Sequence, residues 1–136
     1  MSNDDAQKFL DQIKAGNFNL SELEKMSVET VQPVTVSGWE ACYSSTTGQL
    51  SGYCTVTADN SGDTVTGCGL VIYKSDGTVM FCLQYSNGFN DVEINTSVGT
   101  NLYTTSMGSS VLSIVYGYTQ NSGMYFFNQT LSVGSC

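Results

Sequence analysis

The sequence predicts a mainly β fold, a seven-stranded antiparallel β-sandwich preceded by a short helical N-terminal arm. From Pro33 onward apolar residues alternate with polar ones, as in strands that bury one face. Turn sequences such as "DNSGD", "SNGFN" and "QNSG" recur roughly every ten residues, a spacing typical of β-sandwiches. Only 12% of the residues are charged, so Ser, Thr, Asn, Gln and Gly must form most of the surface.

We therefore divide the chain into a helical N-terminal arm, residues 1–31, and a β-sandwich domain, residues 32–136. A chain of 136 residues is long enough for one domain and too short for two comfortable ones. The expected strands are Val34–Ala41, Leu50–Thr57, Thr64–Tyr73, Val79–Tyr85, Val92–Val98, Val111–Thr119 and Tyr125–Val133.

The N-terminal arm differs from the rest of the chain, since it holds three of the four lysines and six of the twelve acidic residues. Apolar residues with helical spacing predict a first helix that ends at Gly16 and a second short helix after it. Helices this short are not stable alone in water, so the arm must pack on the body or on a neighbouring subunit. The residues expected to dock it are Phe9, Leu10, Ile13, Leu20 and Leu23.

Five cysteines are present, without a CxxC pair, so the sequence indicates no zinc or redox motif. Cys54, Cys68 and Cys82 fit small buried thiols on strand faces, while a Cys54–Cys68 or Cys68–Cys82 disulfide is the alternative. Because five is an odd number, at least one cysteine cannot be paired within the chain. We expect Cys136 either to bond to another chain, with Cys42 as its partner, or to stay a free thiol in a reducing cytosol.

Charge and composition exclude several functions. The net charge is −8 and the chain has no Arg and no His, so it lacks the basic footprint that binds nucleic acid. The commonest general base and metal ligand is therefore missing, and we predict no catalytic, cofactor or metal site and no enzymatic activity. The loop "DNSGD" has oxygen ligands suited to Ca²⁺, but an ordinary polar turn is the favoured interpretation.

No secretory signal and no membrane span are visible in the sequence. The charge-poor, Ser/Thr/Asn-rich composition nevertheless favours an extracellular or virion surface, with the cytoplasm as the alternative. The aromatic residues of the last expected hairpin should divide between a core set and an exposed set. They are Tyr116, Tyr118, Tyr125, Phe126 and Phe127.

Two segments carry a family resemblance. The stretch "GQLSGYCTVTADNSGDTVTGCGLVIYKSDG" (48–77) resembles the B–C hairpin of bacterial fibronectin type III-like modules. The stretch "YTQNSGMYFFNQTLSV" (118–133) is similar to their F–G hairpin. The likeness covers about residues 33–133 and implies an immunoglobulin-like sandwich used for binding, spacing or assembly. The only tryptophan, Trp39, lies on the first expected strand, whereas the family has its inward tryptophan on the second.

Three functional hypotheses follow. The first is a structural or assembly subunit of a fibre, filament or virion surface, with self-association through the N-terminal arm. The second is a monomeric adhesive or ligand-recognition module that uses exposed turn residues such as Phe89 and Tyr103. The third is a modified-peptide precursor, because "FLDQIKAGNFNLSELEKMSVETV" (9–31) resembles helical leader segments that a processing enzyme recognises.

Overall fold

A computed structural model describes Lys8, Asp11, Gln12 and the ranges 34–73, 79–85, 88–99, 110–120 and 124–136, with 79–82, 95–99 and 124 as backbone only. The seven strands predicted from the sequence are confirmed, with small differences at their ends. They are β1 (Val34–Ser44), β2 (Gln49–Ala58), β3 (Val65–Tyr73), β4 (Val79–Tyr85), β5 (Asp91–Gly99), β6 (Ser110–Thr119) and β7 (Met124–Ser135).

Most of the N-terminal arm lies outside the described residues, as do all five residues expected to dock it: Phe9, Leu10, Ile13, Leu20 and Leu23. The three arm residues that are described, Lys8, Asp11 and Gln12, are helical and exposed.

The strands form one seven-stranded sheet in the order β4-β3-β6-β7-β1-β2-β5. The prediction of a purely antiparallel arrangement is wrong in one place, because β1 and β7 pair in parallel. The reason is that β7 has two partners along its length. It pairs with β6 up to Ser132, and its last residues, Val133 to Ser135, then pair with β1.

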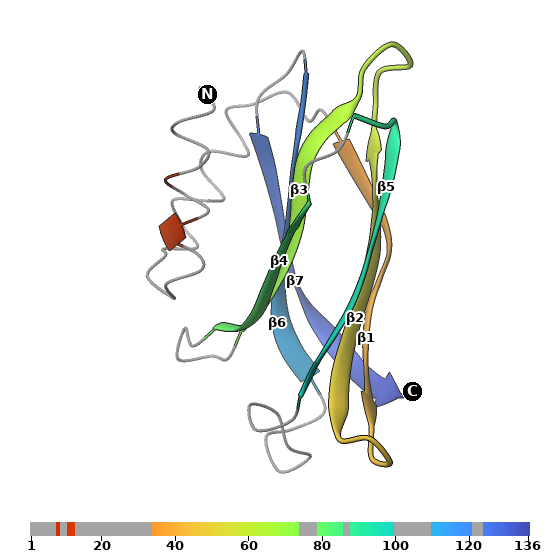
Figure 1. The fold of residues 1–136 in the computed structure, drawn as a ribbon, viewed down its shortest axis with the longest axis vertical. Coiled ribbons are helices and arrows are strands. Elements are labelled where there is room, and N and C mark those ends of the chain that lie inside the picture. Colours follow the sequence, from red (N-terminus) through yellow and green to blue (C-terminus); the bar gives the residue numbers. More distant parts are fainter. Residues whose placement is uncertain are drawn as a thin grey trace.

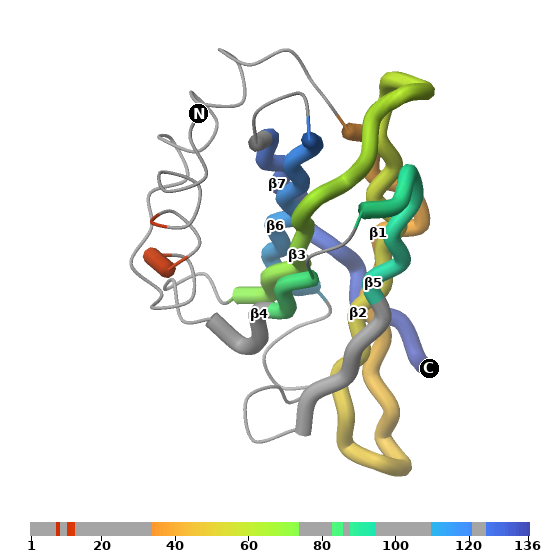
Figure 2. The backbone as a smooth tube through the Cα atoms, turned by 45° about the horizontal axis from the view of Figure 1, so that its top comes forward, coloured from red at the N-terminus to blue at the C-terminus, as the bar shows by residue number. Residues whose placement is uncertain are grey.

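Because β7 passes from one partner to the other, the sheet curls into a nearly closed shape. In Figure 1, β4, β3, β6 and β7 form one layer and β1, β2 and β5 lie beside it. Contacts of β5 with β3 and β4 bring the two ends of the sheet together. The tube in Figure 2 shows the same separation of the two layers from a second direction.

The main hydrophobic core fills the space between the two layers. Trp39 on β1 crosses this space, because its Nε1 donates a hydrogen bond to Ser113 Oγ on β6 at 3.1 Å. The Ser113 hydroxyl donates in turn to the carbonyl oxygen of Val71 on β3 at 2.9 Å. A buried hydroxyl is thereby satisfied. The largest fully buried residues of this core are Leu50, Leu70, Ile72, Ile94, Val34, Val56 and Val65.

A bulge in β1 decides which of its side chains face the core. Ser37 pairs with Thr55 but Glu40 pairs with Tyr53, so β1 carries one extra residue at this point. Gly38 has a φ of 60° there, a conformation that favours glycine. Because side chains alternate along a strand, the extra residue reverses the alternation, and Cys42 on the far side of it faces outward.

The layer formed by β3, β6 and β7 is also buried on the side that faces away from this core. Successive partners across the strands place Val71 beside Ile114, and Tyr116 beside Phe126. These residues alternate with the inward Leu70, Ile72 and Val115, so they point the other way. We call Val71, Tyr73, Ile114, Tyr116 and Phe126 the outer apolar face; none of them is more than 6% exposed.

Candidate functional site

The end of the molecule where β1 and β7 pair carries a disulfide between Cys42 and Cys136, which are 94 residues apart in sequence. Cys42 is paired with Gly134 in the parallel ladder, so the chain needs only two more residues to bring Cys136 alongside. The backbone N–H of Cys136 donates to the Tyr43 carbonyl at 3.1 Å and extends the ladder by one bond. The Cα atoms of the two cysteines are 5.1 Å apart.

From the sequence we expected Cys136 either to bond to another chain, with Cys42 as its partner, or to stay a free thiol. In the structure the two cysteines bond within one chain. The physical reason is the combination of the β1 bulge and the parallel β1–β7 ladder. The bulge places Cys42 on the outer side of β1, and the ladder brings the last residue to the same place. Neither feature leaves a simple periodic signal in the sequence.

Two further cysteines, Cys54 on β2 and Cys68 on β3, are free thiols in the main core. Burial raises the pKa of both thiols to about 12, and the neighbouring Cys68 adds to the effect on Cys54. Protonated thiols are weak nucleophiles, so these groups are suited to packing rather than to covalent chemistry. The alternative Cys68–Cys82 disulfide is not formed: Cys68 pairs with Tyr85 across the β3–β4 ladder, and Cys82 with Val71.

Because of these two buried thiols, we expect the free energy of unfolding to depend on pH in the alkaline range. Above a pH of about 9 the thiols of the unfolded chain lose their protons, while the folded chain keeps them because the pKa there is about 12. The folded state then binds more protons, so stability falls as pH rises, by about 1.4 kcal/mol for each thiol by pH 10. Urea unfolding at pH 8 and 10 measures this loss. A Cys54→Ala/Cys68→Ala variant with an equally large loss would contradict burial of the thiols as its cause.

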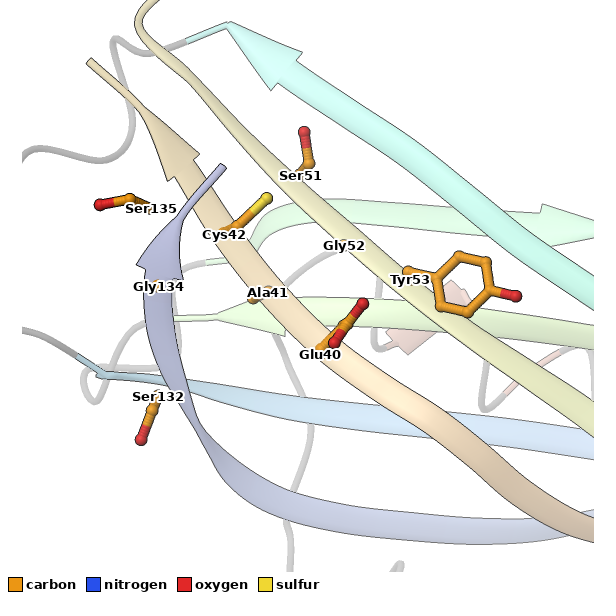
Figure 3. Close-up of a pocket in the computed structure, with 9 residues that line it drawn as sticks. All are labelled: Glu40, Ala41, Cys42, Ser51, Gly52, Tyr53, Ser132, Gly134 and Ser135. Atoms are coloured by element: carbon orange, nitrogen blue, oxygen red, sulfur yellow. The ribbon is translucent and has the colours of Figure 1, made fainter.

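A pocket of about 610 Å³ lies beside the disulfide on the outer side of β1, β2 and β7. Figure 3 shows the Glu40 and Tyr53 side chains projecting from neighbouring strands, with Cys42 and Ser51 further along. The Tyr53 ring packs against Gly38 at the bulge, and its hydroxyl lies 3.3 Å from Thr55 Oγ1. The lining is a carboxylate, a phenol ring and serine hydroxyls, with Ser132, Gly134 and Ser135 contributed by β7.

This pocket was not predicted from the sequence. Its residues are ordinary polar strand residues, and only the fold of β7 onto β1 brings them together. The pocket also leaves the disulfide open to solvent, because Cys42 is half-buried and Cys136 is exposed. A water-soluble reductant can therefore reach the bond in the folded protein.

The opposite end of the molecule presents Phe89, which is 67% exposed. The backbone around it is held in place. The Phe89 carbonyl accepts from Val65 N–H at 2.9 Å, and the Asn90 carbonyl accepts from Ala58 N–H at 2.9 Å. The Asn90 side-chain amide also donates to the Asp63 carbonyl at 3.3 Å. A large apolar ring is thus kept in water by a well-bonded loop.

The "DNSGD" loop, residues 59–63, forms a turn at this same end, with Asp63 N–H donating to the Asn60 carbonyl at 2.9 Å. Its two carboxylates have different neighbours. Asp59 accepts a hydrogen bond from the Thr35 hydroxyl, whereas the buried Asp63 accepts from Thr64 N–H at 2.9 Å. In the described part of the chain, no three His, Cys, Asp or Glu residues come together as metal ligands would.

Neither a protein-family model nor a curated protein matches this sequence. Among solved structures, the chain is similar in fold to a DUF3823 family protein from Bacteroides ovatus ATCC 8483, with a TM-score of 0.51 and 11% identity. The match covers 75% of this chain and 55% of that chain, so this chain spans about half the length of that protein. At this level of identity the likeness concerns the fold alone.

A weaker likeness exists to the superoxide reductase (neelaredoxin) of Ignicoccus hospitalis, with a TM-score of 0.43 and 12% identity, over 82% of this chain and 89% of that chain. A single-substitution variant of that reductase matches with a TM-score of 0.45 and 11% identity, over 81% and 86% of the two chains. These scores are too low to support a functional argument. Within the described ranges, no helix combines the length and hydropathy needed to cross a lipid bilayer.

Proposed function

We propose that this chain is a non-enzymatic structural or assembly subunit, of a fibre, filament or virion surface, whose N-terminal arm docks on a neighbouring subunit. In this proposal the body is an immunoglobulin- or fibronectin III-like β-sandwich. The division of strands supports it, since β1, β2 and β5 face β3, β6 and β7 across one core, as strands A, B, E and C, F, G do in such sandwiches.

The observation that carries the proposal is the covalent link between β1 and residue 136. A load applied between Val34 and Cys136 passes along β1 to Cys42 and then through the disulfide. Residues 43–135 lie inside the closed loop and carry none of it. A subunit held between neighbours in a filament benefits from such a path.

The chemistry of the surface is consistent with a role outside the cytosol. Disulfides form and persist in oxidising compartments, and this one is open to solvent. Among the side chains that the structure describes, the thiols that would be vulnerable there, Cys54 and Cys68, are buried. This arrangement favours an extracellular or virion surface over the cytoplasm.

A second candidate function is a monomeric recognition module, and the exposed Phe89 favours it. Aromatic rings presented on rigid loops are common anchors of protein interfaces. In this alternative the protein works without self-association, and the loop end containing Phe89 contacts a different molecule.

Light scattering coupled to size-exclusion chromatography, with negative-stain imaging, distinguishes the two functions. We expect wild-type protein to form oligomers or polymers, and a Phe9→Glu/Leu20→Glu variant to stay monomeric because charged residues disrupt the arm's apolar side. Gln12→Glu is the matched control, since Gln12 is exposed. A wild-type protein that is monomeric at all accessible concentrations would contradict the assembly function and favour the recognition module.

A further inference from the structure

The outer apolar face is unusual because it is buried on the side of the sheet that faces away from the core. Val71, Ile114 and Tyr116 are fully buried, and Tyr73 and Phe126 are nearly so. In the described part of the chain, no strand lies over them: β1, β2 and β5 are all on the other side of the layer (Figures 1 and 2). Apolar side chains of this size are excluded from water only when something packs on them.

The arm residues that are described point to what packs there. Lys8, Asp11 and Gln12 are helical and exposed, and their spacing of three and four residues places them on one side of a helix. By sequence spacing alone, Phe9 and Ile13 would belong on another side of such a helix, which is the pattern of an amphipathic helix. The red helical segment of Figures 1 and 2 lies on the side of β3, β6 and β7 away from β1, β2 and β5.

We propose that the outer apolar face of β3, β6 and β7 is the docking site of the N-terminal arm, residues 1–31 of this chain. The arm has the complementary chemistry, since its apolar residues lie at helical spacing and its charges lie between them. A short amphipathic helix gains its stability from tertiary packing, and this face is the apolar surface that the body provides for it.

This inference deepens the proposed function by naming the surface on which the arm docks, but it does not depend on self-association. An isolated chain covers the face with its own arm. In an assembly, the same face accepts the arm of a neighbouring copy, because the two arms are chemically identical. Failure of the docking site and failure of assembly are therefore separate results.

The first test uses the full chain with the photo-crosslinking amino acid p-benzoylphenylalanine in place of Phe9, followed by irradiation and peptide mass spectrometry. We expect crosslinks to β3, β6 and β7 at residues 69–73, 112–118 and 124–128. A product at the monomer mass of 14.6 kDa identifies the chain's own arm. A product at about twice that mass identifies a neighbour's arm, and both support the docking site. Crosslinks confined to β1, β2 or β5 would overturn it.

The second test uses matched substitutions in the full chain and hydrogen exchange of the backbone amides. Ile13→Glu should place a charge against the outer apolar face, and we expect at least a roughly tenfold loss of protection over residues 112–118. Gln12→Glu, on the exposed side of the same helix, should change protection less than about twofold. Equal effects of the two substitutions, or no effect of Ile13→Glu, would show that the arm does not cover this face.

Discussion

Removing the Cys42–Cys136 disulfide is expected to lower the free energy of unfolding by about 4 kcal/mol, because the bond closes a loop of nearly the whole body. In the chain-entropy model, a crosslink across about 100 residues raises the free energy of the unfolded chain by somewhat more than this amount. For a domain of this size, the loss corresponds to a fall in Tm on the order of 10–20 °C. A Cys42→Ser/Cys136→Ser variant, unfolded in urea beside the wild type, measures it.

Reductant provides the matched control for this experiment. The bond is accessible to solvent, so wild-type protein in a phosphine reductant should unfold at the urea concentration of the double variant. The double variant itself should not respond to the reductant, because Cys54 and Cys68, the remaining cysteines whose side chains the structure describes, are already free thiols. If the sulfurs instead joined two chains, the variant would lose a dimer band on a non-reducing gel with little change in stability, and the intramolecular assignment would be wrong.

The disulfide illustrates what the sequence could and could not predict. The sequence suggested Cys42 as the partner of Cys136, but for a bond between two chains and with a free thiol as the alternative, whereas the bond lies within one chain. Simple alternation from Val34, however, would turn Cys42 toward the core, since both positions are even-numbered. The bulge at Gly38 reverses this, so that Ala41 faces inward and Cys42 outward. The glycine is visible in "VSGWE", but glycine alone does not distinguish a bulge from a turn.

Strand positions were predictable because they depend on local alternation and on turn residues. In β5, for example, Val92 and Ile94 are buried and Asp91 and Glu93 are exposed, which follows the alternation of apolar and polar residues in this segment. Pairings between distant strands are set by the packing of the whole chain. The parallel β1–β7 ladder therefore could not be predicted from the sequence, and neither could the pocket beside it.

The last hairpin shows a further limit. We expected its aromatic residues to divide between a core set and an exposed set that could include Tyr125. In the structure Tyr125 and Phe127 are half-buried against the main core, with ring centroids 4.9 Å apart, and Tyr116 and Phe126 are buried on the outer apolar face. The expectation of an exposed set is wrong, because none of the five aromatic residues is exposed. Alternation could not show that both faces of the sheet are covered, because that depends on what packs on the sheet from outside.

At one position of the outer apolar face, adding a single methyl group should lower the stability of the folded protein. Gly69 lies in the middle of β3, paired with Gln84 on one side and Tyr116 on the other. A Cβ at Gly69 would overlap with the Tyr116 hydroxyl and with the backbone carbonyl oxygen of Leu83. The Tyr116 ring occupies the space that a side chain at position 69 would need, and a backbone atom in a paired strand cannot move away cheaply.

Gly69→Ala is therefore expected to destabilise the protein by about 3 kcal/mol, measured by urea unfolding. Gly62→Ala is the matched control, because a Cβ there meets open space, and it should change stability by less than about 0.5 kcal/mol. A Gly69→Ala protein as stable as Gly62→Ala would mean that Tyr116 does not lie across β3, and the outer apolar face would not exist in the form described.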